Sequence, residues 1–226
     1  MSAAAGPMAD NPTPIREARA GTWLLAAGVA AGPLYVVVSL AQAVSRPGFD
    51  LSRHPWSVLA NGELGWIQVV NLTLTGLLVV AFSAGARRVL TAGPGSRWAP
   101  RLIGVYGLSL IAAGLLRADP VAGFPLGTPA TPAVSWHGLA HLVAGAVGFL
   151  CLTAGCLLLA HRFGTTDRGW AVATAGAGIA FLGAFAGIAS GGGSPVSVVV
   201  FVAAVLIIWA WFTAYALHLL RTTADR

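Results

Sequence analysis

Six long apolar segments alternate along the chain with shorter stretches that are polar or rich in glycine and proline. Each segment approaches the length of about 20 residues that an α-helix needs to cross the hydrocarbon core of a bilayer. The pattern predicts an all-α fold, a polytopic membrane protein built as a bundle of six transmembrane helices. We expect these helices at residues 22–44, 64–86, 101–116, 135–160, 169–189 and 196–220.

The two ends of the chain differ from the apolar segments between them. Residues 1–21 are rich in alanine and proline, which predicts a disordered tail, and residues 221–226 form a second, short tail. Ala41-Gln42-Ala43 resembles the cleavage site of a signal peptide. The apolar run before it is longer than the core of about 7–15 residues in a typical signal peptide. We therefore expect the first helix to be retained.

The composition makes lipid the expected solvent for much of this chain. Hydrophobic residues make up 57% of the 226 positions and charged residues only 9%. An average soluble domain carries about 25% charged residues. A core large enough to hide this much apolar surface is not expected at this length, so the lipid bilayer is the first partner that the sequence implies.

Positive charge is divided unequally between the two sides of the predicted bundle. The net charge is +6, and all thirteen basic residues are arginines. With both termini in the cytoplasm, ten lie on the cytoplasmic side: Arg16, Arg19, Arg87, Arg88, Arg97, Arg101, Arg162, Arg168, Arg221 and Arg226. Only Arg46, Arg53 and Arg117 lie outside. Cytoplasmic loops are enriched in basic residues, so this asymmetry predicts cytoplasmic termini and makes a nucleic-acid partner unnecessary.

Small residues predict which helix faces pack, because they let two backbones approach closely within lipid. One face of segment 169–189 carries a ladder of them: Gly169, Ala173, Gly176, Ala180, Gly183 and Gly187. We therefore expect this helix to be the most central of the bundle. Segment 196–220 has no such ladder, and we expect more of its surface to face lipid.

Polar side chains at membrane depth predict where the interior of the bundle lies. Gln68, Asn71 and Thr75 share one face of the second segment, and in a medium without water they need hydrogen-bond partners. His137 and His141 lie four residues apart on a face of the fourth segment that also carries glycines. We expect both faces to point inward.

Ionisable residues within a membrane are functional-site hypotheses by default. Sorting the polar residues by depth places a group of them near the outer end of the bundle. This candidate polar or ligand-binding site consists of His54, Gln68, Asn71, Asp119, His137 and His141. The structural alternative is that acidic and basic residues of the outer loops simply pair with one another.

The histidine spacing also raises a metal hypothesis. Two histidines four residues apart on a helix can bind one metal ion, as in the zinc-binding H-E-x-x-H helix. The glutamate of that motif is absent here, because Gly138 follows His137. Asp119 and His54 are the candidates that would complete a zinc site with His137 and His141. A proton-handling or substrate-binding site without metal, and hydrogen bonding alone, stay open.

Haem is not expected in this chain. His141 and His161 are separated by about 30 Å along one helix, which is too far for both to bind the same iron. His161 and His218 lie at predicted inner helix ends, where a histidine beside an arginine is ordinary.

Four short motifs give the chain a resemblance to a protein family. They are His54-Pro55-Trp56-Ser57-x-Leu59, Gly65-Trp66-x-Gln68-x-x-Asn71, Asp119-Pro120-x-x-Gly123-Phe124-Pro125 and His137-Gly138-x-x-His141. With the motifs in this order, residues 22–220 resemble a bacterial six-helix integral membrane family catalogued as domain of unknown function 998. The resemblance implies six helices and a bacterial cytoplasmic (plasma) membrane location, and it implies no activity.

A looser resemblance is to the membrane hydrolase superfamily of alkaline ceramidases and progestin and adiponectin receptors. That superfamily uses His and Asp ligands near one membrane face. This chain departs from the pattern, because it has six predicted spans rather than seven and carries its histidine pair on the fourth span.

Three functions follow from the candidate site. The leading hypothesis is a multi-pass membrane protein whose outward-facing His/Asp cluster binds a small or lipid-like ligand. The enzyme alternative is a metal-dependent membrane hydrolase in which His137 and His141 hold zinc, which would lower the pKa of a bound water toward about 7. The third is a structural or partner-binding membrane protein without chemistry. The sequence identifies neither a substrate nor an oligomeric state.

Overall fold

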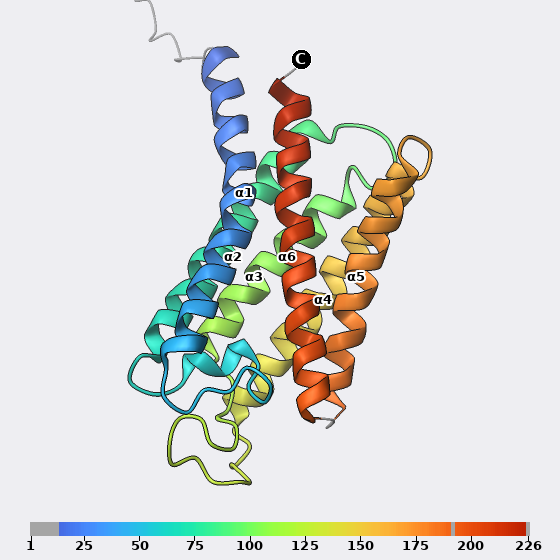
Figure 1. Cartoon of the computed structure of the whole chain (residues 1–226). Coiled ribbons are helices and arrows are strands. Elements are labelled where there is room, and N and C mark those ends of the chain that lie inside the picture. The colour runs from blue at the N-terminus through green and yellow to red at the C-terminus, as the bar shows by residue number, and fades with distance from the viewer. Residues whose placement is uncertain (1–13, 191–192, 225–226) are drawn as a thin grey trace, which may run out of the picture.

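Helices make up nearly all of the regular structure. The computed structural model of the protein describes residues 14–190 and 193–224, and within them it contains six α-helices, one 3₁₀ helix and no strand (Figure 1). In chain order the elements are α1 (Pro14–Ser45), η1 (Trp56–Ala60), α2 (Gly65–Val89), α3 (Trp98–Leu115), α4 (Trp136–Phe163), α5 (Arg168–Ala189) and α6 (Pro195–Ala224). All six α-helices are long and apolar enough to cross a membrane. The expected all-α fold with six spans is confirmed.

The first and last helices extend beyond the expected spans. α1 begins at Pro14, so the prediction of a disordered tail is wrong for residues 14–21, while residues 1–13 lie outside the described part of the chain. Proline suits the first turn of a helix, where its missing N–H would have had no partner, and the Arg and Ala residues that follow favour helix. α6 likewise continues to Ala224, within the expected tail.

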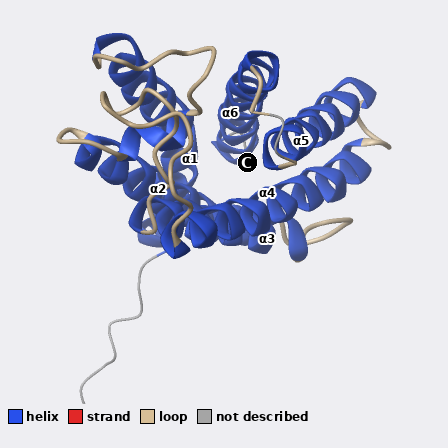
Figure 2. Ribbon diagram, turned by 90° about the horizontal axis from the view of Figure 1, so that it is seen from below, coloured by secondary structure: helices blue, strands red, loops and turns tan. Residues whose placement is uncertain are grey.

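The helices follow one another around the bundle in chain order. Each packs mainly on its neighbours in the sequence, and α6 returns to pack on α1. α1 begins and α6 ends at the same end of the bundle, which we call the termini end (Figure 1). The opposite end carries η1 and two long loops, residues 46–64 and 116–135, which together form the cap. Figure 2 views the bundle from the cap.

α1 and α6 approach closely in the half of the bundle near the termini end. A Cβ added to Gly28 would lie 3.0 Å from the Cβ of Ala216, and one added to Gly32 would clash with the hydroxyl of Thr213. Toward the cap the two helices diverge (Figures 1 and 2).

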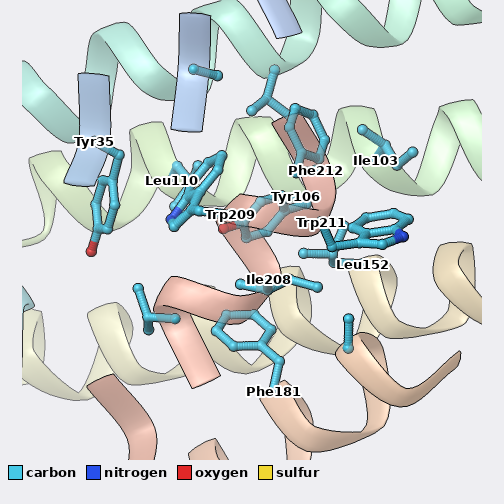
Figure 3. Close-up of a cluster of buried hydrophobic side chains, with 14 of the residues drawn as sticks. Tyr35, Ile103, Tyr106, Leu110, Leu152, Phe181, Ile208, Trp209, Trp211 and Phe212 are labelled. Carbon is cyan, nitrogen blue, oxygen red and sulfur yellow. The ribbon is translucent and has the colours of Figure 1, made fainter. Parts of the chain in front are cut away.

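Aromatic side chains of α6 fill the middle of the bundle. Trp209 packs on Tyr35 of α1 and Tyr106 of α3, with ring centroids 5.3 and 5.9 Å away (Figure 3). Ile208 and Phe212 beside it are also buried. The expectation that more of α6 than of α5 faces lipid is therefore wrong, since 39% of the most apolar stretch of α6 is buried against 28% of that of α5. The reason is that large aromatic residues, rather than a ladder of small ones, make its contacts.

The small-residue ladder of α5 faces outward, so the expectation that α5 is the central helix is also wrong. All six residues of the ladder are exposed. A Cβ added to Gly176, Gly183 or Gly187 would meet no atom within 4 Å beyond its own turn of helix. α5 instead buries Thr174 and Phe181 on its other side. Small residues permit close approach of a second helix, but in the described part of the chain no helix lies against this face.

α2 and α3 pack backbone against backbone at two glycines. A Cβ added to Gly76 would lie 2.5 Å from the carbonyl oxygen of Gly107, and a Cβ added to Gly107 would lie 2.8 Å from that of Gly76. The two glycines are therefore needed together, because each leaves room for the backbone of the other helix.

We expect Gly76→Ala to destabilise the protein by about 1–3 kcal/mol, the usual range for forcing extra volume into a packed interior. The matched change Gly176→Ala adds the same methyl group to the open face of α5. It should be neutral, or stabilising by up to about 1 kcal/mol, because alanine favours helix over glycine. Thermal unfolding of both variants in detergent measures the difference. Equal shifts of the two unfolding midpoints would contradict the packing described above.

Candidate functional site

Arg46 joins the two loops of the cap. Its side chain is almost fully buried, and its guanidinium donates hydrogen bonds to the carbonyl oxygens of Leu59 and, at 2.6 Å, Asn61. The guanidinium carbon also lies 4.8 Å from the centre of the Phe124 ring in the second loop. Asn61 adds a hydrogen bond of 3.0 Å from its Nδ2 to the carbonyl of Ala118. The charge of Arg46 is thus used to hold the cap together.

His54, the first predicted site residue, is part of the same structural scaffold. Its Nδ1 accepts a hydrogen bond from the backbone N–H of Asp50 at 2.9 Å, so Nε2 must carry the proton that it donates to the Ala122 carbonyl at 3.0 Å. The ring packs between Phe49 and Phe124. Since both ring nitrogens already have backbone partners, His54 could bind a ligand only by giving up one of these bonds.

Gln68 and Asn71 point inward as expected, but they form a group of their own between α1 and α2. Gln68 Oε1 accepts hydrogen bonds from Gln42 Nε2 at 2.8 Å and Asn71 Nδ2 at 3.2 Å. Ser39 of α1 bonds to both predicted residues. Thr75, one turn further along α2, is fully buried too. These hydrogen bonds satisfy part of the group where no water is available, but Gln42 Oε1, Asn71 Oδ1 and Thr75 Oγ1 have no partner in the described structure.

Asp119 fixes the start of α4. Its carboxylate accepts hydrogen bonds from both the backbone N–H and the hydroxyl of Ser135, at 2.9 and 2.5 Å. Ser135 is the N-cap of α4, and its Oγ accepts the N–H of Gly138 at 3.0 Å. A Cβ on Gly138 would overlap the Asp119 carboxylate. The Asp119 carboxylate therefore leaves no room for a side chain at position 138. This explains why glycine occupies the position that holds glutamate in the H-E-x-x-H motif.

The two histidines of α4 differ in their surroundings. His137 is half exposed, with Nδ1 3.2 Å from the carbonyl oxygen of Arg117 and 3.9 Å from Asp119 Oδ1. His141 is less exposed and donates from Nδ1 to the Ala113 carbonyl at 2.8 Å. In the neutral ring Nε2 of His141 is then an acceptor without a partner in the described structure. Of the two, His141 is the one available to a ligand within the bundle.

Three groups act on the charge of Asp119. Burial works to raise the pKa of this carboxyl, but the hydrogen bonds from Ser135 and the nearby rings of His137 and His141 together outweigh burial. The pKa therefore lies below the ordinary value for an aspartate. Asp119 is a stable negative charge at neutral pH.

A cavity of about 310 Å³ connects Asp119 and His141 to the middle of the bundle. All six helices contribute to its wall. Its aromatic lining consists of Tyr35, Trp56, Tyr106, Phe149, Phe181, Phe185, Phe201 and Trp209. Gly145 of α4 also lines the cavity, with open space where its side chain would be. Asp119, Ser57 and His141 are its polar residues near the cap, and Ser109 of α3 is a further polar residue of the wall whose hydroxyl donates to the Tyr106 carbonyl. The cavity is therefore mostly apolar, with Asp119 and His141 at one end.

The structure divides the six predicted site residues among three places. Asp119 and His141 line the cavity and His137 lies beside Asp119, whereas His54 belongs to the cap and Gln68 and Asn71 to the α1–α2 interface. The aromatic wall was not predicted as part of the site. An aromatic residue inside an apolar segment fits packing or ligand binding equally well, so the sequence contained no signal that separates the two.

The zinc hypothesis lacks a complete set of ligands in this arrangement. Among the described residues, no three His, Cys, Asp or Glu side chains are grouped closely enough to hold one metal ion. His137 and Asp119 are near each other, but His54 is engaged elsewhere. Zinc binding therefore stays a prediction.

Acid should weaken the start of α4 through Asp119. Because the folded chain lowers the pKa of this carboxyl, its contribution to stability is present above the ordinary aspartate pKa of about 3.9 and is lost as the pH falls through the lower, folded value. We expect Asp119→Asn to remove this pH dependence and to lower the unfolding midpoint at pH 7, since an amide cannot accept both Ser135 bonds. Unfolding midpoints measured from pH 7 to pH 3 check this. The exposed Glu63, changed to Gln, is the control, and an unaltered profile in Asp119→Asn would contradict the role of Asp119.

Comparison with known protein families finds a family model that matches this chain. A family model described as protein of unknown function (DUF998) matches residues 29–218, a stretch that holds all four sequence motifs, the cap and the cavity. Comparison with curated proteins and with solved structures finds no match. The match covers most of the chain and confirms the resemblance that the motifs indicated. The chain belongs to the DUF998 family of membrane proteins.

Proposed function

We propose that this protein binds an amphipathic, lipid-like ligand, with the apolar part in the aromatic cavity and the polar end at Asp119 and His141. The observation that carries the proposal is the cavity itself, which is mostly apolar, with Asp119 and His141 at one end. Ligand sites in proteins are commonly concave and mostly apolar, with a few polar groups that fix orientation. Asp119 and His141 have the position that such groups need.

The size of the cavity supports a ligand with a short chain or a single ring system. At about 30 Å³ for each group of water size, 310 Å³ holds about ten such groups. Part of the wall is closely packed, because Phe149 contacts Phe181 at 4.4 Å and Phe185 at 4.8 Å between ring centroids. A ligand of this size gains most of its binding free energy from apolar contact.

The polar end favours a hydroxyl group. Asp119 and the Nε2 of His141 are acceptors, so they select a ligand group that donates hydrogen bonds. Trp56 Nε1, in the wall of the same cavity, is a buried donor with no acceptor among the described residues. A hydroxyl both donates and accepts, whereas a carboxylate or phosphate would meet the negative charge of Asp119. We therefore infer that the ligand is an alcohol rather than an acid.

The arginine distribution supports an orientation for this site. Arginines are concentrated at the termini end of the described chain, and only Arg46, Arg53 and Arg117 lie at the cap. By the positive-inside rule the termini end faces the cytoplasm. In a bacterial cytoplasmic membrane, which is the location we propose, the cavity would then be on the outer side.

Filling the cavity should weaken ligand binding without disturbing the fold. Gly145→Leu places a side chain into the open space of the cavity and is expected to lower the affinity for a long-chain alcohol by about tenfold or more, since overpacking costs about 1–3 kcal/mol. Full-length protein in phosphatidylcholine nanodiscs is titrated with a brominated long-chain alcohol. Binding is measured as quenching of tryptophan fluorescence, to which Trp56 and Trp209 in the wall contribute.

The matched control is Gly183→Leu on the open face of α5. It adds the same side chain where no atom lies within 4 Å, but outside the cavity. Its affinity should stay within about twofold of the wild type, as for most surface changes. A brominated fatty acid of equal length tests the preference for an alcohol. Equal quenching in Gly145→Leu and wild type would refute binding in this cavity, and tighter binding of the acid would refute the inferred hydroxyl.

A further inference from the structure

A second cavity lies at the termini end of the bundle, opposite to the first. It has a volume of about 170 Å³ and is lined by residues of α2, α4 and α6, among them Arg162, Tyr215 and His218. At about 30 Å³ for each group of water size, it has room for about six such groups. That is enough for a phosphate group and the atoms attached to it, but not for a nucleotide.

Tyr215 brings an unpartnered hydroxyl to this cavity. The residue is 1% exposed, and its hydroxyl is buried with no hydrogen-bond partner in the described structure. Its ring cannot easily turn away, because it is stacked on Trp211 with centroids 5.5 Å apart and packs edge-on against Phe82 and Phe163. A buried hydroxyl without a partner is costly and rare. A ligand oxygen in the cavity would supply the missing partner.

Arg162 brings a positive charge that no carboxylate compensates. Its Nη1 donates to the carbonyl oxygens of Ala92 and Pro94 in the turn between α2 and α3, which holds the guanidinium in place. No acidic side chain of the described residues lies within 4 Å of it. Nε and Nη2 have no hydrogen-bond acceptor in the described structure. A fixed guanidinium with free donors is a common binding group for phosphate.

The surroundings of the cavity also favour an anion. His218 lines it, with its ring against Phe163 and Trp170 at 5.8 and 5.2 Å between centroids. The described residues of this end carry many arginines and two acidic residues, Glu17 of α1 and Asp167, and the Asp167 carboxylate accepts the N–H of Trp170 at the start of α5. The field at this end of the bundle is therefore positive, and basic pockets between helices at a membrane surface bind anionic lipid head groups.

We propose that this second cavity is a binding site for a phosphate group, held by Arg162 and the hydroxyl of Tyr215. The group belongs either to the head of an anionic phospholipid or to a soluble phosphate. Both sources present the oxygen acceptors that the two side chains need. The site is independent of the aromatic cavity, since it lies at the other end of the bundle and shares no lining residue with it.

Thermal unfolding of the full-length protein in a neutral detergent tests this site. Phosphatidylglycerol, inorganic phosphate and diacylglycerol, a lipid without phosphate, are each titrated, and the concentration dependence of Tm gives an apparent affinity. We expect phosphatidylglycerol to raise Tm and diacylglycerol to leave it unchanged. Protection by inorganic phosphate as strong as that by the lipid identifies a soluble phosphate as the ligand. Protection by the lipid alone identifies a head group.

Three variants separate a built site from general attraction of anions. Arg162→Gln should lower the affinity for phosphatidylglycerol by about tenfold or more, as expected for the loss of a charged hydrogen bond. Tyr215→Phe should lower this affinity by about threefold to fivefold. Arg221→Gln removes an exposed charge from the same end without touching the cavity, and should change the affinity by less than about twofold.

The Tyr215→Phe variant separates a loss of ligand affinity from a loss of folding. Without ligand, removing an unpartnered hydroxyl should leave Tm unchanged or raise it, so a loss of affinity is not a loss of structure. The proposal is overturned if neither phosphatidylglycerol nor phosphate raises Tm. It is equally overturned if Tyr215→Phe binds like the wild type, or if Arg221→Gln loses as much affinity as Arg162→Gln.

Discussion

The absence of water inside a membrane-spanning bundle governs every polar group of this protein. Such a group must find its partner within the chain, because lipid offers none. Arg46 is bonded to carbonyl oxygens of the cap, Gln68 to amides and hydroxyls of α1 and α2, and Asp119 to Ser135. Five buried side-chain atoms of the described residues have no partner: three belong to Gln42 of α1 and to Asn71 and Thr75 of α2, whereas Trp56 Nε1 and the hydroxyl of Tyr215 belong to residues that line the two cavities. At the last two a ligand could supply the missing hydrogen-bond partner.

The cap and the cavity are parts of one arrangement. α1 and α6 meet near the termini end and diverge toward the cap (Figure 1), and the aromatic cavity reaches from the middle of the bundle to residues of the cap. Arg46, His54 and Asn61 tie the two cap loops together. Asp119 stands at the junction, since it both starts α4 and lines the cavity. Three of the four sequence motifs therefore lie in the cap or at the polar end of the cavity, whereas the motif with Gln68 and Asn71 belongs to the interface of α1 and α2.

Part of the candidate site could be read from residue chemistry. Gln68 and Asn71 had to point inward because lipid cannot bond them, and they do. Depth in the membrane also placed Asp119, His137 and His141 together near one end. Depth in the membrane does not tell on which side of the bundle a residue lies. The prediction therefore grouped His54, Gln68 and Asn71 with the other three residues, although the structure places them in the cap and between α1 and α2. The aromatic wall could not be found in this way, since its residues come from helices that are distant in the sequence.

The sequence by itself determined the six helices of this protein, because the length and composition of an apolar segment decide whether it can cross a bilayer. It also determined which polar side chains had to be inside. Only the tertiary structure decided which apolar face meets another helix. The small residues of α5 face outward, while the aromatic side of α6 fills the centre. The physical reason is that lipid and protein interior are equally apolar, so hydrophobicity does not distinguish a buried face from an exposed one, and the fit of side chains across helices decides.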